Sequence, residues 1–118
     1  MYTKGKQDVA DALSSIPGVT VTASHNIAIK KLPSILYAEV VNTKANKGKE
    51  KRTLLAYSID IYSEKSTTSI ASQVDDVISA LGFKRGTCLD LDDPSGIRHK
   101  NMKYTGVYDE NTNLYYEE

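Results

Sequence analysis

Few side chains in this 118-residue chain could perform covalent chemistry. Cys88 is the only cysteine, and His25 and His99 are the only histidines. A Cys88–His99 pair could form an activated nucleophile if the fold brought the two together. However, Cys88 lies in a segment with the composition of a strand, where a cysteine most often serves as a small buried apolar residue. Because no further reactive groups support the pair, the sequence predicts no catalytic residue and no enzyme.

An acidic cluster formed by Asp90, Asp92 and Asp93 is the closest approach to a metal site. A calcium-binding EF-hand loop requires a glycine at its sixth position and a glutamate at its twelfth. Here Pro94 interrupts the pattern and the glutamate is missing. A single cysteine also excludes a multi-thiolate metal site and an internal disulfide. We therefore expect a solvated acidic turn, with no bound metal and no cofactor.

The most strongly charged feature is a basic hairpin segment over residues 42–53. One interpretation is a solvated hairpin tip. The other is a flexible cationic arm that becomes ordered on an acidic protein surface or on nucleic acid. The segment contains no aromatic residues on which bases could stack, so sequence-specific recognition of nucleic acid is not expected. Its cations are Lys44, Lys47, Lys49, Lys51 and Arg52, against a lone Glu50.

The composition is that of one ordinary globular domain spanning residues 1–118. Charged residues make up 25% and the formal net charge is zero, so no global field attracts the chain to DNA or to a membrane surface. No apolar run approaches the length of a membrane span, and the first residues lack the apolar core of a signal peptide. We expect the chain to act where it is made, or in a particle assembled there.

Two segments have helical periodicity. In residues 6–18, Val9, Leu13 and Ile16 form an apolar stripe, Thr3 is a candidate cap, and Pro17-Gly18 ends the helix. The second helix, residues 66–82, is the clearest element. Ser66 or Thr67 could cap its start, and Gly82 suits the left-handed position after its end. Its apolar face consists of Ile70, Val74, Val77, Ile78 and Leu81.

Alternating or β-branched segments predict the strands. The strongest is residues 54–64, where Leu55, Tyr57, Ile59 and Ile61 face one way and Ser58 and Asp60 the other. The other strands are expected at 19–24, 34–42, 83–92 and 102–109, with a short sixth at 113–116 and a loop over 93–101. The order α-β-β-β-α-β-β predicts an α+β fold, a mainly antiparallel sheet with both helices on one face.

Several local signatures resemble the tail terminator proteins of tailed bacteriophages, also called tail completion or tail-to-head joining proteins. They are Y-x-I-D-I-Y at Tyr57–Tyr62, L-G-F at Leu81–Phe83 and Y-T-G-V-Y-D at Tyr104–Asp109. None is a catalytic fingerprint; the resemblance depends on their order and spacing over nearly the whole chain.

The resemblance implies a structural protein of the virion, made in the cytoplasm of a bacterial host. Such proteins form a ring, typically of six subunits, on the head-proximal end of the tail tube. The ring ends tube polymerisation and docks on the head connector. The implied partners are copies of the chain itself, the tail tube protein and the head–tail connector proteins, with no membrane. DNA passes through such a ring, so we expect the basic segment to reach towards the tube or the connector, away from the channel.

Half of the eight tyrosines lie in the last fifteen residues, at a chain end that would ordinarily fray. Because tyrosine is enriched in the cores of protein interfaces, we expect this end to be completed by a neighbouring subunit. The alternative is that Tyr104 or Tyr108 packs on the chain's own sheet. The interface candidates are Tyr104, Tyr108, Tyr115 and Tyr116, together with the cations of the basic segment.

Two other functions stay open at this point. One is another phage neck protein, such as a head-completion or stopper protein. The other is a small adaptor that binds nucleic acid through the lysine-rich segment, and this binding should weaken steeply as salt is raised.

Overall fold

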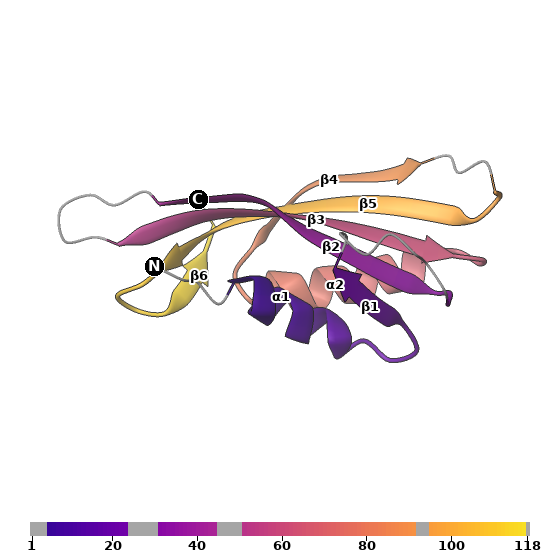
Figure 1. Cartoon of the computed structure of the whole chain (residues 1–118), viewed down its shortest axis with the longest axis horizontal. Coiled ribbons are helices and arrows are strands. Elements are labelled where there is room, and N and C mark those ends of the chain that lie inside the picture. Colours follow the sequence, from indigo (N-terminus) through magenta and orange to yellow (C-terminus); the bar gives the residue numbers. More distant parts are fainter. Residues whose placement is uncertain (1–4, 24–30, 45–50, 92–94, 118) are drawn as a thin grey trace.

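A computed structural model describes residues 5–23, 31–44, 51–91 and 95–117 of the chain. It has the predicted α+β fold and the predicted element order (Figure 1). The elements are α1 (Gly5–Ser14), β1 (Thr20–Ala23), β2 (Ser34–Lys44), β3 (Arg52–Ser63), α2 (Thr68–Ser79), β4 (Lys84–Leu91), β5 (Arg98–Asp109) and β6 (Leu114–Tyr116).

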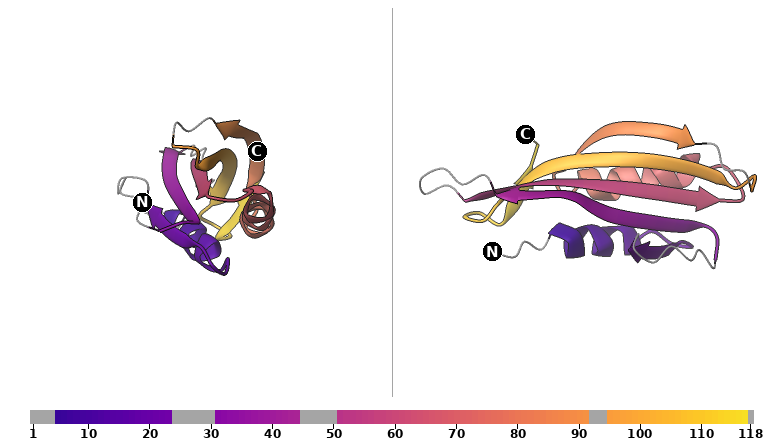
Figure 2. Two further views of the ribbon diagram at one scale, coloured as in Figure 1. Left: turned by 90° about the vertical axis from the view of Figure 1, so that its right-hand side faces the viewer. Right: turned by 45° about the horizontal axis from the view of Figure 1, so that its top comes forward.

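One six-stranded sheet organises the molecule, with the strand order β1-β2-β3-β5-β4. Only the β1–β2 pair is parallel; every other pair is antiparallel. β6 and β4 share one side of β5, β6 opposite residues 107–109 and β4 opposite residues 99–105. Both helices cover the same face, and the other face, here called the open face, carries no helix (Figures 1 and 2). The long central strands make the molecule elongated, 51 × 24 × 23 Å.

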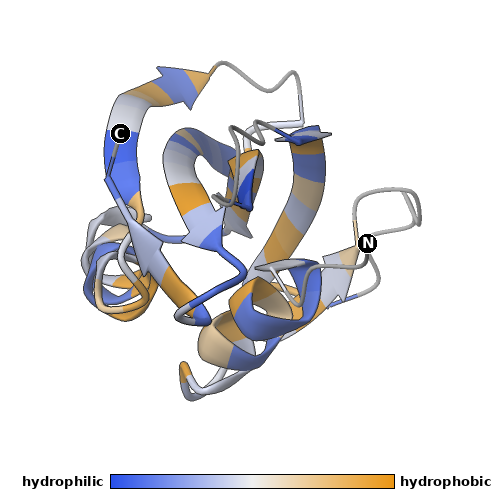
Figure 3. Cartoon of the chain, turned by 90° about the vertical axis from the view of Figure 1, so that its left-hand side faces the viewer, coloured by the Kyte–Doolittle hydropathy of each residue, from blue (hydrophilic) through white to orange (hydrophobic). Residues whose placement is uncertain are grey.

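The core lies between the sheet and the two helices. Along β3 every second residue is buried, which is the period of a strand with one covered face. Figure 3 shows the matching alternation of hydrophilic and hydrophobic residues along the strands. The buried side chains include Leu55, Tyr57, Ile59 and Ile61 of β3, Met102 and Tyr104 of β5, Val74 and Ile78 of α2, and Val9 and Leu13 of α1.

Both ends of α2 can be compared with the sequence. Thr67 occupies the N-cap position but makes no side-chain capping bond. Instead, Ser66 Oγ accepts the backbone N–H of Thr68 at 3.2 Å. At the other end Gly82 has a φ of 113°, as the left-handed position predicted for it requires. The candidate cap of the first helix, Thr3, lies outside the described residues.

The predicted loop over residues 93–101 is wrong for its last four positions. β5 begins at Arg98, and residues 98–101 pair with residues 60–63 of β3. The sequence of this stretch is polar and suggested a turn. Polar side chains are compatible with a strand at this place, because His99 and Asn101 lie on the open face and bond to Asp60. The length of β3 therefore decides where β5 starts.

Two buried tyrosines donate their hydroxyl protons to carboxylates. Tyr57 donates to Glu39 Oε1 and Tyr104 to Asp75 Oδ1, each at 2.8 Å. Burial, and then the hydrogen bond to a carboxylate, raises the pKa of both phenols well above the usual 10.0. Both tyrosines therefore stay protonated in the folded chain when free tyrosine ionises.

Raising the pH above 10 is expected to destabilise the fold. The unfolded chain then releases both phenolic protons and the folded chain keeps them. The contribution of the two tyrosines to the free energy of unfolding is therefore fully present below pH 10. Above pH 10 it falls by up to about 1.4 kcal/mol per pH unit for each tyrosine. Urea unfolding between pH 9 and 12 measures the slope. The control Tyr57→Phe/Tyr104→Phe should flatten it, and an unchanged slope in that control would contradict the assignment.

Candidate functional site

Besides the short outer sides of β1 and β6, the sheet leaves two longer stretches of strand edge without a partner among the described residues. The first, here called the β4 edge, is Lys84–Leu91, which pairs with β5 on one side only. The second, the β2 edge, is residues 38–44. β1 pairs with β2 only over Ser34–Tyr37, so no strand of the described part of the chain lies along the rest of that side of β2. Unpaired backbone N–H and C=O groups along such edges can bind another strand.

Exposed aliphatic side chains concentrate at these two edges. Single exposed apolar residues are common on protein surfaces and need no explanation; their grouping is informative. On the β2 edge, Val40 and Val41 are 57% and 42% exposed. On the β4 edge, Leu89 and Leu91 are 52% and 40% exposed. The remaining large exposed hydrophobic residue of the described chain is Leu114 on β6. Each open edge thus combines free backbone groups with an aliphatic pair.

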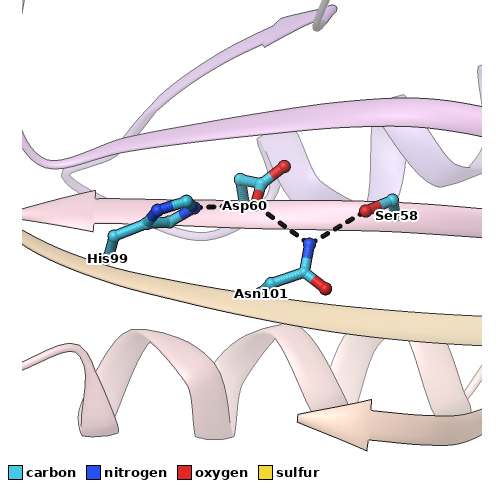
Figure 4. A network of polar contacts seen from close by, with 4 residues as sticks. All are labelled: Ser58, Asp60, His99 and Asn101. Carbon is cyan, nitrogen blue, oxygen red and sulfur yellow. Dashed lines mark hydrogen bonds and ion pairs between the residues drawn. The ribbon is translucent and has the colours of Figure 1, made fainter. Parts of the chain in front are cut away.

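A polar network crosses the open face between β3 and β5 (Figure 4). His99 Nε2 lies 2.7 Å from Asp60 Oδ1. The Asn101 amide donates to that oxygen and to Ser58 Oγ, both at 2.9 Å. The Tyr62 ring stacks on His99 with 4.1 Å between ring centroids. These bonds satisfy half-buried polar groups and hold the two central strands in register.

The network does not have the arrangement of a hydrolytic triad. In a triad, a histidine lies between the carboxylate and the nucleophile. Here Asp60 and Asn101 separate His99 from Ser58 (Figure 4). The structure also keeps Cys88 and His99 apart. Cys88 is half-buried opposite Met102, on the helix-covered face, and His99 lies on the open face opposite Leu91. The described residues therefore form neither a hydrolytic triad nor the Cys88–His99 pair.

The interface tyrosines predicted from the sequence pack within this chain. Tyr104 and Tyr108 are buried in the core, and the Tyr108 hydroxyl donates to Asn113 Oδ1 at 2.7 Å. The half-buried Tyr115 ring lies 5.0 Å from both the Phe83 and the Tyr108 rings, and its hydroxyl donates to Asp8 of α1. These contacts attach β6 to the rest of the fold, so the tyrosine-rich end packs on residues of the same chain.

Tyr116 is half-buried, and the guanidinium of Arg52 lies 6.0 Å from the centre of its ring. Arg52 begins β3 and Lys44 ends β2, so the basic segment does join the strands of a hairpin. Lys51 accepts the backbone N–H of Glu110 at its carbonyl oxygen, 2.9 Å away. Lys47 and Lys49 lie outside the described residues, and their arrangement stays a prediction.

The remaining predicted sites do not come together in the described part of the chain. Asp90 is exposed and forms an ion pair with Lys100 at 2.9 Å, and Asp92, Asp93 and His25 lie outside the described residues. In those residues no three histidine, cysteine or acidic side chains gather where they could hold a metal ion. Neither of the helices that the structure describes has the length and apolar composition needed to cross a membrane.

The sequence reasoning missed the aliphatic pairs on the open edges. A faint signal is present, because Val40-Val41 interrupts the alternation of its strand and Leu89-Asp90-Leu91 places two leucines on one face. No protein-family model matches the chain, and no curated protein matches its sequence.

Proposed function

We propose that this chain is a non-enzymatic structural protein of a phage virion. In this proposal its copies form a ring on the head-proximal end of the tail tube, end polymerisation of the tube and join the tail to the head connector. One observation carries the proposal: the two open edges of the sheet belong to different strands, and each carries its own exposed aliphatic pair.

Two unlike edges favour a ring over a two-fold dimer. In a two-fold contact the same patch of both copies meets itself, whereas a head-to-tail contact joins two different patches and generates a ring when the rotation closes. The β2 edge and the β4 edge are separated by β3 and β5 and differ in sequence. A copy can therefore bind one neighbour through each edge.

The charge of the chain suits this function. A strongly basic channel would retain DNA through its phosphates, whereas this chain has a formal net charge of zero. The ring would let DNA pass without holding it. Lys44 ends β2 and Arg52 begins β3, so these two cations lie at the end of the β2–β3 hairpin. In the proposal the basic segment of residues 42–53 faces the tube or the connector and not the channel wall.

Deleting the gene and imaging the particles tests the proposed function. The proposal predicts overlong tail tubes beside filled, unjoined heads. Normal-length tails with leaking heads would instead assign the chain a head-completion role in the same neck. Intact particles would reject the assembly function. The purified chain should then be tested for nucleic-acid binding across salt concentrations, since binding through five cations would fall steeply with salt.

A further inference from the structure

We propose that the β4 edge of one copy pairs, antiparallel, with the β2 edge of the next copy, so that a single sheet continues around the ring. The inference rests on the proposed function and adds the contact that builds the ring. Its occupant is a second copy of this chain.

Strand direction is compatible with this contact. β4 runs antiparallel to β5, β5 to β3, and β3 to β2. β4 therefore runs opposite to β2 within one copy. A neighbour added as a continuation of the sheet presents its β4 to β2 in the antiparallel sense. Antiparallel hydrogen bonds can then form on either side of the register shifts at Glu39/Val41 of β2 and Arg85/Cys88 of β4.

The aliphatic pairs lie on the matching face. Leu89 and Leu91 are opposite Asn101 and His99, whose network occupies the open face. Val41 is opposite Ala56, which alternates with the buried Tyr57, so it also lies on the open face. Joining the two edges therefore brings Leu89 next to Val41 on one face, as a cross-strand pair of the kind that stabilises sheets.

The offset between the two edges agrees with closure. Leu89 is level with Asp60 of β3 and Val41 with Ala56, four residues away. Aligning Leu89 with Val41 of a neighbour thus shifts that copy by about 13 Å along the strands. The neighbour lies four strand spacings away, about 19 Å.

If the copies close into a flat ring and not a helix, these two displacements set the tilt of the strands relative to the ring axis. The tangent of this tilt is the ratio of the shift along the strands to the spacing across them, which gives about 35°. With Leu89 aligned on Val41, the tilt is thus at the lower end of the range of about 35–45° found in closed sheets. With four strands from each of about six copies, the sheet would have about 24 strands, more than the 16–18 that already leave an aqueous channel.

Cysteine cross-linking within assembled particles tests the contact. The native thiol is first removed with Cys88→Ala, and Val41→Cys and Leu89→Cys are then introduced together. Both positions are substantially exposed within one copy, so the substitutions should not disturb folding. A short bifunctional maleimide reagent should convert the double variant into a ladder of covalent multimers that ends at the size of the ring.

Matched controls separate this contact from others. Each single variant alone should give no cross-linked product, and particles that contain both single variants should give dimers and no longer species. Dimers from Leu89→Cys alone would show β4 pairing with β4 and overturn the inference. So would joined particles that contain the double variant and yield only monomer. Those outcomes leave the proposed function standing, whereas intact particles after gene deletion would reject both proposals.

Discussion

Gly82→Ala is expected to lower the free energy of unfolding by about 3 kcal/mol or more, combining a strained backbone with a clash that cannot relax cheaply. Gly82 has a φ of 113°, which side-chain-bearing residues rarely adopt. A Cβ at this position would overlap the backbone carbonyl of Tyr115 in β6. Because Tyr115 packs on Phe83 and Tyr108, β6 can move away only by losing those ring contacts.

Gly18→Ala is the matched control for this prediction. Gly18 also has a positive φ, 77°, but a Cβ there would meet nothing within 4 Å. Its substitution should cost about 1 kcal/mol, from backbone strain alone. Urea unfolding of the two variants isolates the contribution of the β6 contact. Equal losses in the two variants would show that the packing of β6 on Gly82 contributes little to stability.

Leu89→Asp is expected to abolish the joining of heads to tails while leaving the folded chain nearly as stable as before. Leu89 is exposed in the single copy, so the free energy of unfolding should change by no more than about 1 kcal/mol. In the proposed contact the new carboxylate would stand beside Val41 on the open face and replace an apolar cross-strand pair, a kind that contributes up to about 1 kcal/mol. A loss of about 1 kcal/mol weakens each contact by about 5-fold, and every contact of the ring is affected.

Leu114→Asp makes the same chemical change on a strand outside both open edges. Among the five large hydrophobic residues that are exposed in the described chain, Leu114 has the greatest exposed fraction, 64%. Its strand, β6, lies against the α2–β4 connection. This variant should support normal numbers of joined particles when it replaces the wild-type chain. Plaque counts and electron microscopy of particles complemented with each variant compare Leu89→Asp with Leu114→Asp. Equal defects would mean that Leu89 matters only as a surface leucine, and normal joining with Leu89→Asp would remove the β4 edge from the contact.

Much of the fold could be predicted because local pattern and tertiary structure agree. The period of β3 and the stripe of α2 are each set by a single covered face, so their residues alternate or repeat accordingly. The start of β5 could not be predicted in the same way. His99 and Asn101 are strand residues because β3 extends far enough to pair with them and Asp60 binds them. That pairing partner is distant in the sequence.

The tyrosine-rich end shows a second limit. Composition suggested a surface awaiting a partner, but the same aromatic groups pack equally well on the chain's own core. Tyr115 contacts Phe83 and Asp8, which lie 32 and 107 residues away in the chain, so only the fold could assign it. The β2 edge and the β4 edge could not be predicted from the sequence for a related reason. Val41 and Leu89 are edge residues because of the strand order, and strand order is a property of the whole sheet.

The central claim, that copies of this chain form a ring at the head-proximal end of the tail, can be tested most directly by electron cryomicroscopy of the head–tail junction, at a resolution that traces the backbone. The account predicts a ring of this chain between the tail tube and the connector, with β4 of each copy hydrogen-bonded to β2 of the next. A junction in which every ring is built from other chains would contradict it.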